Sequence, residues 1–296
     1  MKRVKQINKY ISFISSESYN LIGLSIVRVA IGIVSLIMLV ANFQTRYDLW
    51  SDSIFNSTFL NFNHTTFDIF YSLIVISLIV YILGFESIVF NVFIYISMYF
   101  LYNLNNYILD GGNNILIIIL FYMIFTKNAQ YFSIYKGENN SQFRNSIHNI
   151  FLFLILFQVC VLYFFAGFAK ARGDFWYSGV APYYVFQIKT FTMGWIDNII
   201  EPFIKSPLIL LIISYSAIFM QMLFPILIFN KITKVLVVIG SITFHLSIIA
   251  VMGLVTFGMI MIALDLLFIN DQQFIKLKKF ITKRRESFLN QKSNYI

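Results

Sequence analysis

Lys170, Arg172 and Asp174 stop a long apolar run, and their residue types make this the first place to look for chemistry. Ionisable groups at membrane depth are costly and are usually retained for a reason. A lysine withdrawn from water, or placed near a second cation such as Arg172, has its neutral amine favoured and can act as a general base near neutral pH. The structural alternative is that Lys170 extends its charged end to the lipid headgroups.

Lys170 is followed by an aromatic, partly polar segment that is too polar to continue a membrane helix. Trp176 lies in this segment, Tyr163 lies two helical turns before Lys170, and this composition suits the membrane interface. The charged groups expected nearest to Lys170 are Asp110, Arg172 and Asp174. These residues are the candidates for supporting a base at Lys170.

Three further ionisable residues fall inside apolar runs: Arg28, His245 and Asp265. Arg28 in the first run and Asp265 in the last are expected in the same half of the membrane, so we predict a buried structural ion pair. His245 is expected deep in its run, either as a hydrogen-bonded packing residue or as a polar group supporting Lys170.

The residue patterns that disulfide, metal or nucleotide chemistry needs do not occur in the sequence. Cys160 is the one cysteine, so no disulfide or cysteine cluster can form within the chain, and the histidines have no companion at metal-ligand spacing. No glycine-rich phosphate loop occurs either, since the paired glycines after Asp110 fit no such motif. We therefore predict no metal site and no nucleotide-driven pump.

The composition predicts an integral membrane protein. Of 296 residues, 59% are hydrophobic and only 12% are charged, whereas a soluble domain carries about a quarter charged residues. The mean hydropathy is +0.77. In a membrane protein, the distribution of basic residues sets the orientation in the bilayer, so the formal charge of +9 does not indicate nucleic acid binding. We therefore expect lipid and no nucleic acid among the partners.

The apolar runs predict an all-α, polytopic bundle of about eight transmembrane helices. Most of the 22 Lys and Arg residues fall in segments that share one side if both termini are cytoplasmic, which is the orientation we predict. We expect the spans at about 21–41, 70–83, 88–109, 115–125, 150–169, 207–229, 235–252 and 254–269.

The chain divides into three parts. Residues 1–19 form a basic cytoplasmic segment, and residues 20–270 form the transmembrane domain. Residues 271–296 alternate basic and apolar side chains, which predicts an amphipathic helix lying on an anionic inner leaflet. A tail that binds a partner protein is the alternative.

Longer motifs carry a family resemblance. Tyr163-Phe-Phe-Ala-Gly-Phe-Ala-Lys170, followed by Trp176 and by Gly179-Val-Ala-Pro-Tyr-Tyr184, resembles the HTTM family, the membrane domain shared with vitamin K-dependent gamma-carboxylases. Phe244-His245 with Gly253-Leu-Val-Thr-Phe-Gly-Met259 looks like its second signature, and Gly23-Leu-Ser-Ile-Val-Arg28 is typical of its first span. A narrower likeness is to membrane proteins of sporulation-delaying antimicrobial-peptide systems.

The resemblance implies roles for particular residues. Lys170 falls at the lysine proposed to deprotonate vitamin K hydroquinone, and His245 falls at a histidine of the corresponding late span. A quinol-type cofactor is implied by the family alone. Two positions depart from the carboxylase pattern: Asn113 and Asn114 replace a histidine, and Gln221 stands at an acidic position.

The function that we expect is maturation of a secreted antimicrobial peptide of sporulation-delaying type, in a multi-pass protein of the bacterial plasma membrane. A carboxylase-related, peptide-modifying enzyme would use Lys170 as its base at the outer face, with His245 in support. Its partners would be a short peptide precursor and a small soluble protein. The alternative is a non-enzymatic scaffold, a peptide exporter or an immunity protein.

Overall fold

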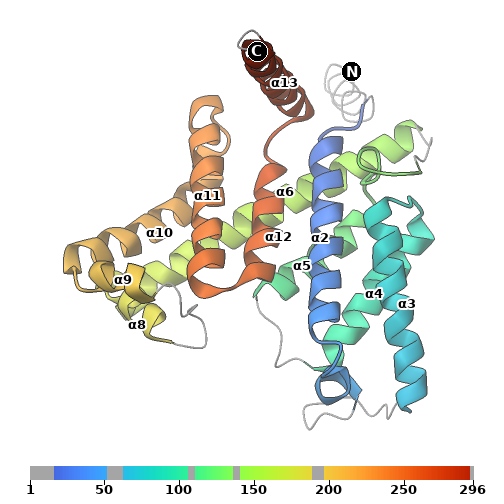
Figure 1. The fold of residues 1–296 in the computed structure, drawn as a ribbon, viewed down its shortest axis with the longest axis horizontal. Helices are drawn as coiled ribbons and strands as arrows, with labels where there is room; N and C mark the ends of the chain where they lie inside the picture. Colours follow the sequence, from blue (N-terminus) through green and yellow to red (C-terminus); the bar gives the residue numbers. More distant parts are fainter. Residues whose placement is uncertain (1–16, 52–62, 106–110, 136–140, 189–196, 294–296) are drawn as a thin grey trace, which may run out of the picture.

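The computed structural model describes residues 17–51, 63–105, 111–135, 141–188 and 197–293, and no strand occurs in these ranges. The described chain is built from helices that pack around α2 and α12 (Figure 1). In chain order they are α2 (Leu21–Ala41), the short π-helix η1 (Tyr47–Ser51), α3 (His64–Leu83), α4 (Ile88–Leu104), α5 (Gly111–Met123), α6 (Gln142–Arg172), α7 (Asp174–Tyr177), α8 (Ala181–Gln187), α9 (Asp197–Ile204), α10 (Pro207–Leu227), α11 (Lys231–Met252), α12 (Val255–Leu266) and α13 (Asp271–Ser293).

Each of the eight expected spans corresponds to a helix, namely α2 to α6 and α10 to α12. Among the described residues, five of them, α2, α3, α6, α10 and α11, are long and apolar enough to cross a membrane alone. The helices α4 and α5 are apolar but shorter, and α12 passes into α13 through a bend of 101°. The chain is a multi-pass helical membrane protein, whereas the count of eight crossings stays a prediction.

The two ends of the membrane domain meet. The Asn20 side chain donates to the Leu267 carbonyl at 2.6 Å, and the amides of Leu21 and Ile22 donate to the Asp271 carboxylate at 3.0 and 2.9 Å. Asn20 does not cap α2 with its own side chain, so Asp271 takes that role from the other end of the chain. The start of α2 and the end of α12 therefore lie together at one end of the bundle, an arrangement compatible with an even number of spans.

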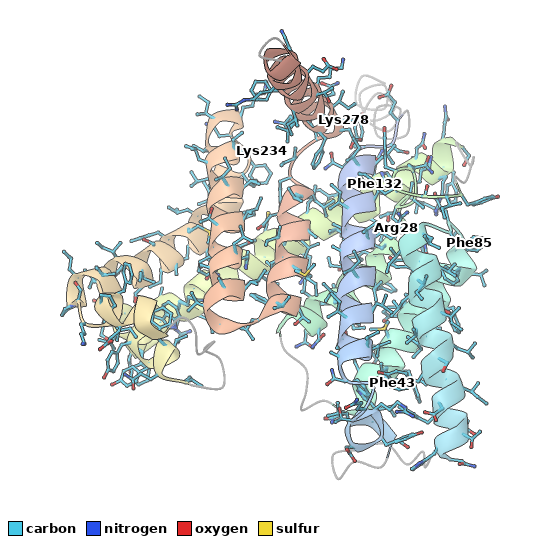
Figure 2. The ribbon with its side chains drawn as sticks, viewed as in Figure 1. Arg28, Phe43, Phe85, Phe132, Lys234 and Lys278 are labelled. Atoms are coloured by element: carbon cyan, nitrogen blue, oxygen red, sulfur yellow. The ribbon has the colours of Figure 1, made fainter. Side chains whose placement is uncertain are left out.

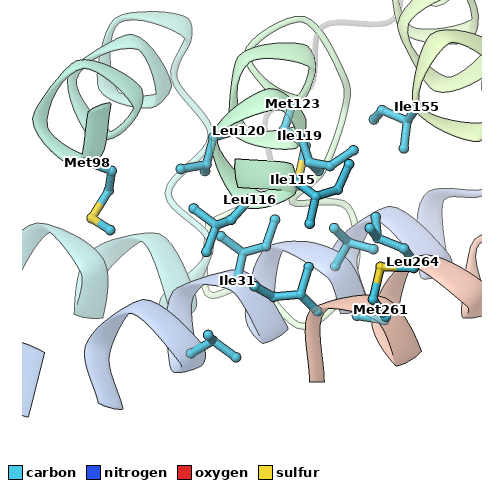
Figure 3. Packing of buried hydrophobic residues seen from close by; sticks show 14 of the residues in the cluster. Ile31, Met98, Ile115, Leu116, Ile119, Leu120, Met123, Ile155, Met261 and Leu264 are labelled. Atoms are coloured by element: carbon cyan, nitrogen blue, oxygen red, sulfur yellow. The ribbon is translucent and has the colours of Figure 1, made fainter. Parts of the chain in front are cut away.

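The core lies where α2, α5 and α12 converge (Figure 3). Ile31 of α2, Leu116 and Ile119 of α5, and Met261 and Leu264 of α12 are almost entirely buried there. Because lipid is as apolar as these side chains, the helices are held together by close packing rather than by exclusion of water. This packing places α12 between α2 and α11. The side of α12 toward α11 contributes to the site described below.

Arg28 is buried, with an exposed fraction of 1%, and lies against the segment that joins α5 to α6 (Figure 2). Its guanidinium donates to four carbonyl oxygens, of which that of Asn128 lies at 3.1 Å; the others belong to Ile82, Tyr131 and Phe132. The expected ion pair with Asp265 is not formed. Backbone carbonyls accept hydrogen bonds from the buried guanidinium in place of a carboxylate, because its terminal N–H groups can reach several oxygens at once.

Polar side chains close the same end of the bundle. Gln130 donates to the Glu86 carboxylate at 2.9 Å, and Lys127 donates to Asn145 at 2.6 Å. Burial raises the pKa of the Glu86 carboxyl and lowers the pKa of the Lys127 ammonium. His148 accepts from the Lys127 amide and contacts the Tyr19 carbonyl, both at 2.8 Å, so the start of α6 is tied to the start of α2.

Candidate functional site

Four buried polar side chains from three helices form one hydrogen-bonded group. Tyr163 of α6 donates to the Asp265 carboxylate of α12, with its hydroxyl 2.8 and 3.1 Å from the two oxygens. Ser241 of α11 donates to the same carboxylate at 2.6 Å and also contacts the Tyr163 hydroxyl. One turn further along α11, Nε2 of His245 lies 2.8 Å from that hydroxyl. The group joins three helices around one carboxylate.

The hydrogen bonds determine which nitrogen of His245 carries the proton. A carboxylate can only accept, so the single hydroxyl protons of Tyr163 and Ser241 are directed toward Asp265. Nε2 of His245 must then donate to the Tyr163 oxygen, and we assign the Nε2–H tautomer on this ground. Nδ1 is left with a lone pair, and within the described chain it has no hydrogen-bond partner.

His245 and Tyr163 border a cavity of about 560 Å³, a size that suits a small ligand. Its wall is largely apolar and comes from α6, α7, α8, α10, α11 and α12. The cavity reaches the surface where Ile213 of α10 and Ser247 of α11 are exposed. Its polar lining side chains are few, and the ones that bear on chemistry are Tyr163, Lys170, Gln221 and His245.

Lys170 borders the cavity two turns of α6 beyond Tyr163. At about 1.5 Å per residue, the two Cα atoms are about 10 Å apart along the helix axis. The Lys170 ammonium lies 5.2 Å from the centre of the Trp176 ring, a cation–π contact. In the described ranges no carboxylate lies within ion-pair distance of it. Lys170 is thus half-buried at an apolar cavity without a neutralising anion.

Close packing of α6 on α10 sets the depth of these groups. The ring of Tyr163 stacks on Phe224 at 4.0 Å between centroids. One turn further along α6, a Cβ at Gly167 would lie 2.7 Å from the backbone nitrogen of Met222, so only glycine lets the helices approach this closely. This contact puts Gln221 between the level of Tyr163 and the level of Lys170.

A turn after α6 carries Trp176 over the cavity. Gly173 ends α6, and α7 starts at the next residue. Gly179, at φ +79°, then turns the chain toward α8 and packs against Leu211 of α10, where a side chain would meet Leu211 at 2.9 Å. The Tyr215 hydroxyl donates to the Tyr177 carbonyl at 2.9 Å and fixes the turn to α10.

The structure brings four of the candidate residues together. Lys170, His245, Tyr163 and Trp176 all border the one cavity, and Asp265 joins them through Tyr163. Arg172 and Asp174 are exposed outside it, with the guanidinium of Arg172 over the Phe168 ring at 5.7 Å. Asp110 lies outside the described residues.

Sequence reasoning missed Ser241 altogether and treated Gln221 only as a departure from the carboxylase pattern. A signal for Ser241 existed, because Ser241 and His245 are four residues apart and share a helix face. No group of three or more His, Cys, Asp or Glu side chains that could hold a metal ion is found in the part of the chain that the structure describes.

The description "HTTM domain" belongs to the family model that matches residues 17–272, nearly the whole of the helical body. The chain belongs to the HTTM family. It is also similar to sporulation-delaying protein SdpB of Bacillus subtilis (strain 168), with 26% identity over 171 residues. That match covers 56% of this chain and 53% of the relative, so it spans about half the length of the curated protein. No solved structure matches.

The HTTM domain thus holds an amine, an imidazole, a phenol and a carboxylate around an apolar cavity. Proton transfer needs groups of this kind within reach of the reacting atom and shielded from bulk water. Tyr163 links His245 to Asp265, so a charge that forms on the imidazole has a carboxylate two hydrogen bonds away. The arrangement suits removal of a proton from a group bound in the cavity.

Proposed function

We propose that this HTTM protein is a membrane-embedded maturation factor for a secreted antimicrobial peptide of sporulation-delaying type, located in a bacterial plasma membrane. The similarity to SdpB supports the peptide system. We propose further that it modifies the peptide, in a carboxylase-related reaction at the outer face of the membrane. Its partners would be the short peptide precursor and a small soluble protein.

One observation carries the enzymatic part of this proposal: Lys170 borders the cavity half-buried, with the Trp176 ring rather than a carboxylate beside it. A structural lysine at a helix end would extend to the headgroups or pair with Asp174, four residues away and exposed. An amine kept in an apolar wall is suited to act as a base, because burial disfavours its charged form.

The other polar groups have supporting roles in this mechanism. Lys170 removes a proton from the bound group, and the ring of Trp176 lies beside the ammonium that this transfer produces. Asp265 and Ser241 hold Tyr163, and Tyr163 holds the His245 ring with Nδ1 unpartnered. The apolar walls limit contact between water and the amine, and this favours the neutral form of Lys170.

A quinol-type cofactor, as in related carboxylases, is compatible with the residues present. The cavity offers aromatic walls from Trp176, Phe186, Phe244 and Phe257 for a ring, and the unpartnered Nδ1 of His245 for a hydroxyl. Such a group would supply reducing equivalents when bound. The steps assigned to Lys170, Tyr163 and His245 do not depend on it.

The test is mass spectrometry of a co-expressed precursor peptide with the wild-type protein and with Lys170→Ala. We expect a mass change in the peptide with the wild type only, with both proteins equally abundant in the membrane. Lys170→Arg, which keeps the charge and the contact with Trp176 but is not a base, should also be inactive. Normal maturation with either variant would contradict a base at Lys170 and favour a scaffold, exporter or immunity protein.

A further inference from the structure

Two polar atoms in the cavity wall are deeply buried and unpartnered within the described chain. They are Nδ1 of His245 and Oε1 of Gln221, on side chains with exposed fractions of 1% and 5%. A buried acceptor without a partner costs about 1–3 kcal/mol, so a native structure rarely leaves one without a reason. The side chains of both residues line one cavity, and we take this as an indication that a ligand bound there supplies the missing partners.

We propose that His245 and Gln221 form a two-acceptor site that recognises hydrogen-bond donors on an otherwise apolar ligand. The ligand carries N–H or O–H groups on an apolar body that fills the rest of the cavity. This proposal rests on the cavity named under the proposed function but not on any reaction there, because it concerns binding alone.

The acceptor character of His245 follows from its neighbours. Nε2 donates to the Tyr163 oxygen because the Tyr163 proton is committed to Asp265, so Nδ1 can only accept. The Asp265 carboxylate thus makes Nδ1 of His245 an acceptor through Tyr163, although Asp265 does not contact that nitrogen. A ligand that offers only acceptors would leave Nδ1 unsatisfied, and it is rejected for that reason.

Gln221 adds a second acceptor at a different depth. Its Cβ is 3.0 Å from the position of a Cβ at Gly167, one turn nearer Lys170 than Tyr163 is. The side chains of Gln221 and His245 therefore join the cavity wall at different levels along α6, and a ligand with donors at two positions along its length can satisfy both. A peptide has such donors in its backbone N–H groups, and a lipid-soluble molecule with hydroxyl groups has them as well.

Ser214 provides a matched control on the same helix. Its hydroxyl is also buried and unpartnered in the described chain, but it does not border the cavity. A general effect of removing a polar atom from α10 would appear in Ser214→Ala, whereas a ligand effect would appear only in Gln221→Leu.

The experiment compares two pairs of probes, each with and without a donor on the same body. The hydroxyl pair is 4-octylphenol and 4-octylanisole, and the amide pair is N-octylacetamide and N-methyl-N-octylacetamide. Binding to the purified full-length protein in detergent is measured as the rise in thermal unfolding midpoint, reported by a thiol-reactive dye on the sole cysteine, Cys160.

We expect the donor-bearing member of at least one pair to bind about tenfold more tightly than its alkylated partner, and Gln221→Leu to reduce this preference severalfold. Ser214→Ala should keep it. A preference in the amide pair indicates a peptide ligand, and one in the hydroxyl pair indicates a lipid-soluble hydroxyl compound. Equal binding within both pairs by the wild type would overturn the proposal, even if Gln221→Leu does not fold. A preference unchanged by Gln221→Leu would overturn it too.

This result is independent of the reaction. If the wild type shows the donor preference but the peptide still matures with Lys170→Ala, the two-acceptor site is supported and the proposed base is contradicted. A protein that fails the binding test while Lys170→Ala blocks maturation would keep the base and lose the site.

Discussion

The Tyr163 hydroxyl donates to the Asp265 carboxylate across 102 positions of the chain, at 2.8 Å to the nearer oxygen. This bond joins α6, which carries Lys170, to α12, the helix at the centre of the bundle. It also settles the protonation of His245 on α11. The hydrogen bonds of Tyr163 thus hold the candidate site together at its buried end.

Tyr163→Phe tests the contribution of the hydroxyl alone, because the substitution keeps the ring. The ring can still stack on Phe224, but buried polar groups lose a partner, so we expect a loss of about 1–3 kcal/mol in the free energy of unfolding. Nε2 of His245 loses its partner, and we expect peptide maturation to fall at least about tenfold. Maturation rate at equal protein abundance is the measurement. Unchanged activity would show that His245 does not need Tyr163.

Asp265→Asn should be more harmful than Tyr163→Phe. An amide in place of the carboxylate offers one acceptor oxygen to two hydroxyls and adds an N–H group with no acceptor waiting, at a cost of about 1–3 kcal/mol. The proton on Tyr163 is then free to turn to His245, which reverses the tautomer. Nitrogen-15 NMR of labelled histidine should report a change from Nε2–H to Nδ1–H at His245; an unaltered spectrum would contradict the assignment.

Gly167→Ala and Gly240→Ala form a matched pair. At Gly167 a methyl group meets the Met222 backbone at 2.7 Å, so α6 and α10 must separate, and we expect a loss of about 1–3 kcal/mol. At Gly240 in α11 nothing lies within 4 Å of the new methyl group, and alanine should stabilise the helix by about 0.5–1 kcal/mol. Thermal unfolding of both variants checks the opposite signs; a destabilised Gly240→Ala protein would contradict the packing described.

Arg28→Lys should destabilise the end of the bundle despite keeping the charge. Lysine has one ammonium in place of the guanidinium fork that reaches four carbonyls, and we expect a loss of about 3 kcal/mol in the free energy of unfolding. Arg172→Lys is the control, since Arg172 is exposed, and its unfolding midpoint should match the wild type. Equal midpoints for both variants would show that the carbonyl contacts carry little stability.

The helices were predictable because apolar length and turn residues are local properties. Gly84 lies between the spans expected at about 70–83 and 88–109, and it ends α3 at φ +87°, a conformation that favours glycine. The span expected at about 115–125 corresponds to α5, which begins earlier, at Gly111. The contact of Asp271 with α2 joins residues 250 positions apart, and no local pattern contains it.

Partners inside the bundle were not predictable in the same way. Arg28 and Asp265 lie on neighbouring helices, as the expected ion pair required, but they point to different sides. Arg28 faces the carbonyls after α5, whereas Asp265 faces Tyr163 and Ser241. Every residue has a carbonyl, so the residue types that follow α5 could not indicate a site for a buried guanidinium. Lys170 and His245 stood out as ionisable residues in or at the end of apolar runs, and the resemblance added the expectation that both serve one site.

The capping of α2 by Asp271 has a consequence for biogenesis. The first membrane helix leaves the ribosome long before residue 271 is made, so its leading amides have no carboxylate partner until every helix from α2 to α12 has been synthesised. The domain therefore closes only after α12 has been made, when Asp271 at the start of α13 contacts the start of α2. A nascent chain cut short before α13 would present an uncapped first helix to the proteases that survey the membrane, and its removal would keep incomplete copies from accumulating.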